Sequence, residues 1–293
     1  MERSPLAVPV KHSVGLNRPA RTLPPLACDS HMHIFDPRFA PSPHWRRAPP
    51  DAPVAVYRQL QGRLGAQRTV VVTPSTYGTD NACTLDALAQ LADSARGVAV
   101  VDHGVDDAEL DLLHAQRVRG LRVNFVTPQS WGETTPEMLT TLARKVARLE
   151  GWHIQVFMHP EQIVALESVL STLPVPLVVD HMGRIDPAQG PQAPAFSALR
   201  RLLDAGKAWV KLSGAYMRTS VHGPSYADTL PLGRALVQAA PERLVWGSDW
   251  PHTTEAPGTV NDADLVDLLQ AWTGSDAVMD RILVDNPARL YGF

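Results

Sequence analysis

The sequence has few cysteines, no long apolar run and little net charge. Its 293 residues contain only Cys28 and Cys83, too few for a disulfide framework, which favours reduced thiols in the cytoplasm. No stretch reaches the roughly 20 apolar residues of a membrane span, and the first 25 residues lack an apolar core. We therefore expect neither a membrane helix nor a secretory signal. A formal net charge of −3 gives no reason to expect nucleic acid or an anionic membrane as partner.

A Gly-x-Gly-x-x-Gly fingerprint after the first expected strand is also absent, which removes the usual sign of dinucleotide binding. What is present is a series of short apolar runs separated by segments of helical spacing. Strands are expected at 26–34, 68–74, 97–102, 119–125, 153–158, 175–181, 208–213 and 243–249. Helical spacing is clearest over 81–95, 136–149 and 194–205. Strands apolar on both faces that alternate with helices indicate a parallel sheet, and eight repeats predict a (β/α)8 TIM barrel.

The chain is expected to consist of two parts. Residues 1–25 contain five prolines and predict an extended N-terminal arm that lies on the fold or in solvent. Residues 26–293 show no linker and no shift of composition, so we expect them to form a single barrel domain. The segment 286–293 is expected to be a short terminal helix whose tail docks on the barrel.

Polar and ionisable residues gather at the expected C-terminal ends of the strands, where TIM barrels carry their chemistry. His31 and His33 lie two residues apart on the first strand, so both rings point to one face. Asp249 ends the eighth strand, which neighbours the first strand in a closed barrel. The other strand ends supply Ser75, Arg122, Asn124, His159, His181 and Arg218. Burying three imidazoles and a carboxylate without a function would be costly, which favours a catalytic cluster over histidines that only serve the core.

Four motifs give the chain a resemblance to a known family. They are the His-Met-His at 31–33, VVDHMGR at 178–184, VWGSDWPH at 245–252 and DNPARLYGF at 285–293. In this order they resemble the amidohydrolase superfamily of the amidohydrolase 2 type. The branch is that of 2-pyrone-4,6-dicarboxylate lactonases and sugar-acid lactonases. The similarity runs through nearly the whole expected barrel and implies the same fold and a lactonase activity.

The resemblance also implies roles for particular residues. His31, His33, His181 and Asp249 match the family's catalytic positions, and Ser75, Arg122, Arg218 and His252 match its substrate-binding positions. Three positions depart from the pattern. The chain has 126–128 (Val-Thr-Pro) where these lactonases have another arginine, and it has Phe157 in place of a tyrosine. Arg47 lies near the position of a second tyrosine and could replace lost positive charge. These departures leave the substrate's identity open.

The residue types suggest a hydrolysis mechanism. Asp249 can take a proton from water as general base, while the histidines donate hydrogen bonds to the carbonyl oxygen as charge develops there. Arg122 and Arg218 suit the recognition of a carboxylate. We expect a hydrolase that opens a small anionic lactone, such as 2-pyrone-4,6-dicarboxylate or a muconolactone-like compound. The alternatives are a sugar-acid lactonase or lactone isomerase of the galactarolactone type, and a zinc-dependent decarboxylase on the same scaffold.

The sequence leaves two interpretations of the His-x-His pair. With Asp249, the pair could hold one zinc ion, and His159 could be a fourth ligand if it shares the inward face of Phe157. No lysine ends the fourth strand to carry a bridging carbamate, so a two-metal centre is not expected. The lactonases that the chain resembles work without metal, so we expect no cofactor to be required, with one zinc ion as the alternative. No pattern indicates an oligomeric state.

Overall fold

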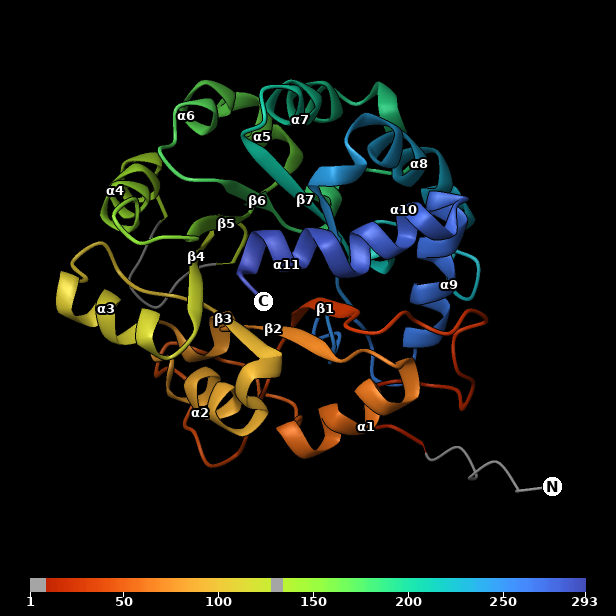
Figure 1. The fold of residues 1–293 in the computed structure, drawn as a ribbon, viewed down its shortest axis with the longest axis horizontal. Coiled ribbons are helices and arrows are strands. Elements are labelled where there is room, and N and C mark those ends of the chain that lie inside the picture. The colour runs from red at the N-terminus through yellow and green to blue at the C-terminus, as the bar shows by residue number, and fades with distance from the viewer. Residues whose placement is uncertain (1–8, 128–133) are drawn as a thin grey trace.

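The structure is a computed structural model that describes residues 9–127 and 134–293, and it confirms the predicted barrel (Figure 1). Eight parallel strands follow one another around the sheet in chain order. They are β1 (Cys28–Met32), β2 (Arg68–Val72), β3 (Ala95–Ala99), β4 (Val118–Asn124), β5 (His153–Phe157), β6 (Leu177–Val179), β7 (Ala208–Leu212) and β8 (Leu244–Trp246). Each coincides with a strand predicted from an apolar run.

Helices surround the strands in Figure 1, and the C-terminal helix crosses the end of the barrel. They are α1 (Val54–Leu64), α2 (Ala82–Leu91), α3 (Asp107–Ala115), α4 (Pro136–Val146), α5 (Pro160–Ala165), α6 (Glu167–Ser171), α7 (Pro194–Asp204), α8 (Leu230–Ala239), α9 (Asp262–Thr273), α10 (Asp276–Asp280) and α11 (Asn286–Tyr291). The three predicted helices are present, but the helix expected over 81–95 ends at Leu91. Ala92 has a φ of 52°, which breaks the helix, and Ala95 already begins β3.

Most strands are shorter than predicted, and for β6 and β8 this affects the site. β6 ends at Val179 and β8 ends at Trp246, so His181 and Asp249 lie beyond the strands rather than at their last residues. Both have left-handed backbones, with φ of 50° and 60°. Such angles are costly for residues other than glycine and concentrate at functional sites, where the surrounding structure holds them.

The barrel closes where β1 meets the segment after β8. The backbone N–H of Asp249 donates to the carbonyl of His31 at 2.8 Å, and that of His33 donates to the carbonyl of Trp250 at 2.8 Å. Gly247 makes this approach possible, because a Cβ atom there would lie 2.6 Å from the Cβ of His31. The buried Asp29 carboxylate adds a further link by accepting from the N–H and hydroxyl of Ser248. The first and last strands are thereby brought together at the site.

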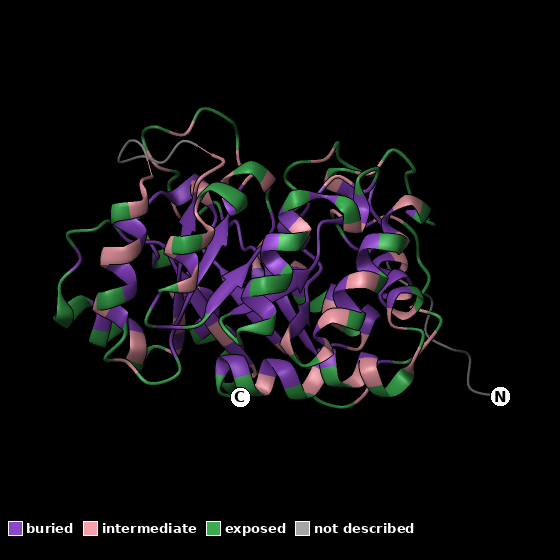
Figure 2. Ribbon diagram, turned by 90° about the horizontal axis from the view of Figure 1, so that it is seen from above, coloured by how far each residue is buried: buried purple, intermediate pink, exposed green. Residues whose placement is uncertain are grey.

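The N-terminal end of the barrel is plugged by the end of the chain. Leu290 and Tyr291 of α11 pack with the inward valines of β2, β3, β6 and β8. Arg96 donates to the carbonyl of Gly292 at 2.7 Å. The predicted docking of the terminal helix is confirmed. Figure 2 shows the buried strands enclosed by half-buried helices, with exposed loops at the opposite end.

Residues 9–25 of the predicted arm lie against the barrel; residues 1–8 lie outside the described residues. Val14 donates to the carbonyl of Val260 at 2.8 Å, and Leu23 is buried. The indole N–H of Trp250 donates to the carbonyl of Lys11 at 3.0 Å. These contacts join the arm to the segment after β8. Within 9–127 and 134–293, no helix is long and apolar enough to cross a membrane.

Candidate active site

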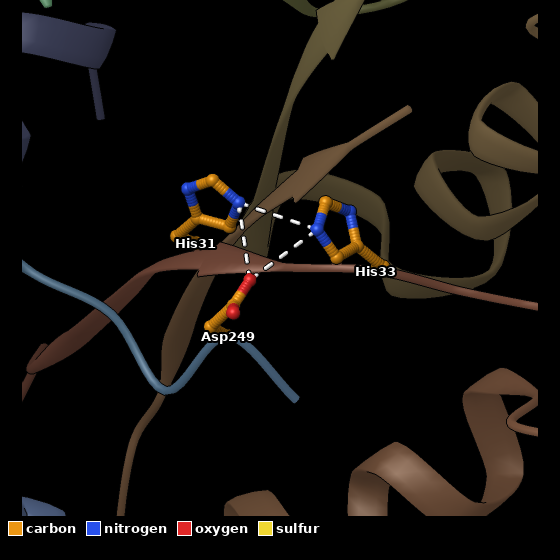
Figure 3. Close-up of side chains that lie close together, drawn as sticks. All are labelled: His31, His33 and Asp249. Carbon is orange, nitrogen blue, oxygen red and sulfur yellow. Dashed lines mark hydrogen bonds and ion pairs between the residues drawn. The ribbon is translucent and has the colours of Figure 1, made fainter. Parts of the chain in front are cut away.

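The four predicted catalytic residues meet at the C-terminal end of the barrel. His31 Nε2 and His33 Nε2 lie 3.3 Å apart, and each lies 3.4 Å from Asp249 Oδ1 (Figure 3). His181 Nε2 approaches the same oxygen at 3.9 Å. All four side chains are buried. One carboxylate oxygen is thus surrounded by three imidazole nitrogens.

The outer nitrogen of each imidazole has its own partner. His33 Nδ1 donates to the carbonyl of Val72 at 2.8 Å, so a neutral His33 presents a lone pair on Nε2. His181 Nδ1 pairs with the hydroxyl of Ser213 at 2.8 Å. His31 Nδ1 lies 3.2 Å from the ammonium of Lys211 and 3.3 Å from Asp180 Oδ1. When the ammonium donates to this nitrogen, the proton of His31 is on Nε2, which faces the cluster.

The cluster combines the neutral imidazoles of His31 and His181 with an ionised carboxylate. Burial lowers the pKa of His31 well below its ordinary value, and the Lys211 charge acts in the same direction. Burial also lowers the pKa of His181. Burial alone would raise the pKa of the Asp249 carboxyl, but His181, His33 and His31 more than reverse this, so it lies well below its ordinary value. Asp249 is therefore a proton acceptor at neutral pH.

A chain of hydrogen bonds extends from the second oxygen of Asp249. The Tyr216 hydroxyl donates to Oδ2 at 2.7 Å, and His252 Nδ1 donates to the Tyr216 oxygen at 3.0 Å. His252 Nε2 in turn donates to Asp262 Oδ2 at 3.1 Å. Burial lowers the pKa of His252, but Asp262 more than offsets this, and the pKa is raised. His252, predicted to bind substrate, thus has both ring nitrogens bonded within the protein, behind Asp249.

A buried polar layer lies beneath the cluster. The Lys211 ammonium donates to the carbonyl of Ser30 and to Gln155 Oε1, both at 2.8 Å. Gln155 and Arg122 donate to Asp180 Oδ2 at 3.1 and 3.3 Å. Burial lowers the pKa of Lys211 to about 8. The sequence interpretation missed this layer, although Lys211 and Gln155 are conspicuous as polar residues in the middle of apolar strands.

Three predicted substrate-binding residues line a small cavity above the cluster. This cavity of about 80 Å³ reaches His33 and Asp249 and is bordered by Arg122 and Ser75. The Ser75 hydroxyl accepts from Asn124 at 2.8 Å. Arg47 also borders it, with an exposed side chain that stacks on the Trp45 ring at 5.0 Å. The cavity therefore joins the proposed base to two guanidinium groups.

Arg218 and His159 do not line this cavity. Arg218 is exposed. His159 follows the end of β5, so it no longer shares the alternation that directs Phe157 inward, and its Nδ1 pairs with Arg184 Nη1 at 3.2 Å. His159 belongs to neither group of potential metal ligands among the described residues, which removes the structural basis for a fourth ligand.

The cluster nevertheless has the spacing of a metal site. His31, His33 and Asp249 form one group of potential ligands, with mutual distances of 3.3, 3.4 and 3.4 Å. In a tetrahedral zinc site with bonds of about 2.0–2.1 Å, two ligand atoms lie about 1.6 times that distance apart, or about 3.3–3.4 Å. These three side chains therefore fit one divalent ion.

A (β/α)8 barrel with a histidine–aspartate cluster at its C-terminal end defines a class of barrel hydrolases. The sequence matches the Amidohydrolase family over residues 28–293, and the chain belongs to that family.

Two relatives and one solved structure match nearly the whole chain. The 4-sulfomuconolactone hydrolase of Hydrogenophaga intermedia is 34% identical, over 100% of this chain and 96% of that protein. The 2-pyrone-4,6-dicarboxylate hydrolase of Comamonas testosteroni is 36% identical, over 94% and 93%. The structure of a probable 2-pyrone-4,6-dicarboxylic acid hydrolase from Acinetobacter baumannii, with citric acid bound, has a TM-score of 0.78 and 28% identity, covering 92% and 100%.

Proposed function

We propose that this chain hydrolyses a small carboxylated lactone, with water activated by Asp249. The observation that carries the proposal is the geometry of that carboxylate. Oδ2 is fixed by the Tyr216 hydroxyl, and Oδ1 lies among three imidazoles at the base of a cavity bordered by Arg122. The names of the relatives at 34% and 36% identity support the same reaction.

The proposed reaction follows from the protonation states of the site. Asp249 takes a proton from water as the water oxygen bonds to the lactone carbonyl carbon. The Nε2–H of His181, whose ring borders the cavity, donates to the carbonyl oxygen while it carries negative charge, an interaction typically worth about 100- to 1000-fold in rate. The bond between that carbon and the ring oxygen then breaks, and the ring oxygen takes the proton from Asp249. The product is the ring-opened hydroxy acid.

Arg122 and Ser75 are proposed to hold the acid group of the substrate. Arg122 donates to Asp180 through its Nε, and the residue borders the cavity. Arg47 at the rim is a second candidate for this role. We assign no substrate contact to Arg218 or His159. We also propose that the enzyme acts in the cytoplasm, without nucleic acid or membrane as a partner.

We propose further that the reaction requires no metal, since Asp249 and His181, which both border the cavity, supply the base and the hydrogen-bond donor. The alternative is one zinc ion held by His31, His33 and Asp249, whose spacing fits it. When bound, zinc would acidify a water molecule and polarise the carbonyl. In that case His31 would bind through the Nε2 lone pair, with its proton on Nδ1 facing Asp180.

One experiment tests both proposals. Chelator-treated protein, with its metal content measured by mass spectrometry, is incubated with 2-pyrone-4,6-dicarboxylate or muconolactone, with and without zinc. Loss of the pyrone absorbance and NMR of the products follow the reaction. Ring-opened acid from metal-free protein supports both lactone hydrolysis and its independence of metal. Activity only with zinc would support hydrolysis and show that the zinc alternative is correct. Products that are isomers without added water, or no reaction of any carboxylated lactone, would refute hydrolysis.

A further inference from the structure

A second and larger cavity adjoins the catalytic one. Its volume is about 330 Å³, against about 80 Å³ for the cavity above Asp249. Small-molecule sites usually measure about 300–1,000 Å³, so the small cavity alone is undersized for a substituted lactone. The two cavities share lining residues from the segments after β1, β2 and β8: Phe35, Trp45, Arg47, Thr76 and Thr253. A ligand whose carbonyl reaches Asp249 can therefore extend into the larger cavity.

The lining of the larger cavity is mainly apolar. Beyond the shared Phe35 and Trp45 it includes the buried Pro251 and Val260, together with prolines at 49, 50 and 257. Apolar walls with few polar groups are typical of sites that hold the non-reacting part of a small molecule. A methylene or aryl group placed against such walls would remove apolar surface of both the protein and the ligand from water.

The charges of the two cavities differ. Arg122 borders only the catalytic cavity, and Arg47 lies on the shared wall. Of the charged side chains that line the larger cavity beyond that wall, Glu255 is acidic and no further lysine or arginine is present among the described lining residues. His12 and His252 also line it, but they are bonded to the Asp51 carbonyl and to Asp262, so beyond Arg47 a second anionic group would meet no lysine or arginine there. The larger cavity is thus suited to a neutral substituent.

One polar group marks the wall between the cavities. The indole N–H of Trp45 is buried, and it has no hydrogen-bond partner among the described residues. An unpaired buried donor costs free energy, which a ligand oxygen would relieve.

We propose that the preferred substrate is a lactone with one acid group at Arg122 and an apolar alkyl or aryl substituent that occupies the larger cavity. This inference rests on the proposed lactone hydrolysis and specifies its substrate class. It separates this chain from relatives whose named substrates carry a second anionic group, because beyond Arg47 on the shared wall the larger cavity offers that group no lysine or arginine.

The test compares kcat/KM for muconolactone, for the same lactone with an n-propyl group on the ring, and for 2-pyrone-4,6-dicarboxylate. Burial of each methylene is worth about fourfold, so the propyl lactone is expected to gain up to about 50-fold over muconolactone. Calorimetric titration of the wild-type protein with the two corresponding lactams measures binding independently of turnover.

A cavity-filling variant supplies the matched comparison. Ala48 is exposed and lines the larger cavity only, so Ala48→Phe is expected to lower kcat/KM for the propyl lactone at least tenfold more than for muconolactone. Ala188→Phe, at an exposed position that lines neither cavity, is expected to preserve the propyl preference.

The possible outcomes separate the two ideas. Hydrolysis with no gain from the propyl group, or with the dicarboxylate preferred, overturns the apolar subsite and leaves lactone hydrolysis standing. If no lactone is hydrolysed but the propyl lactam binds more tightly than its parent, the subsite stands and the proposed reaction fails. Equal binding of both lactams without hydrolysis refutes both.

Discussion

Replacing Asp249 with asparagine removes the proposed proton acceptor while keeping the size of the side chain. The structure can accommodate this change. The amide oxygen can take the place of Oδ2 and accept from the Tyr216 hydroxyl, which lies 2.7 Å away. The amide nitrogen would then lie where Oδ1 is, 3.4 Å from the Nε2 lone pair of His33. We therefore expect Asp249→Asn to fold normally.

The expected loss of activity follows from the role of a general base. Such groups typically contribute about 100- to 10,000-fold, so kcat should fall by at least 100-fold. Arg122 and Ser75 are untouched, and the change in KM should stay within about tenfold. A fall in kcat with little change in KM identifies an interaction that is made mainly in the transition state.

The assay is steady-state hydrolysis of muconolactone by metal-free wild type and variant, with circular dichroism to check folding. Asp102→Asn is the control, because Asp102 is an exposed aspartate just beyond β3, where it accepts from the N–H of Gly104 at 2.6 Å. The control should keep wild-type kcat. Turnover of a folded Asp249→Asn protein within about fivefold of wild type would refute the base assignment.

Three further predictions test the surroundings of the site. Tyr216→Phe removes a hydrogen bond to a charged group, worth about 1.5–3 kcal/mol, so kcat should fall about 10- to 100-fold at nearly constant KM; unchanged kcat would contradict a positioning role. Gly247→Ala would place a Cβ atom 2.6 Å from His31 Cβ, so calorimetry should show a destabilisation of about 1–3 kcal/mol and kinetics should show a lower kcat. As a control, Gly62→Ala on α1, where a Cβ atom would meet open space, should be neutral or stabilising. Burial lowers the pKa of His153 to about 3, and its ring nitrogens have no partner among the described residues. Since the unfolded ring titrates near 6.5, His153 favours folding fully above that pH and loses this contribution as pH falls towards 3, at about 1.4 kcal/mol per unit. His153→Phe should flatten this part of the pH profile in urea unfolding, and an unchanged slope would contradict it.

The barrel and the core of its site follow from local patterns. Apolar runs identified every strand, because strands buried on both faces are apolar throughout. The alternation of side chains was enough to place His31 beside His33. The pairing with Asp249 followed because a closed barrel makes its first and last strands neighbours.

The rest of the site depends on geometry that no local pattern encodes. Beyond the end of a strand the alternation stops, so the directions of His159 and Arg218 could not be read from their distance to the strand. Tyr216 lies after β7, His252 after β8 and Asp262 at the start of α9, and nothing in their spacing indicates the chain of hydrogen bonds. Lys211 could have been found, because it is a charged residue within an apolar strand. It was missed because only residues at the C-terminal ends of the strands were considered as site residues.

The closure of β1 against the segment after β8 has a consequence for biosynthesis. The histidine pair is translated early and the aspartate late, so the complete site cannot exist before residue 249 has been added. The terminal helix that plugs the other end of the barrel is made later still. Activity in this protein therefore requires the closed barrel. If a fragment lacking the last strand and helix were mixed with the missing segment, the recovery of turnover would measure their association.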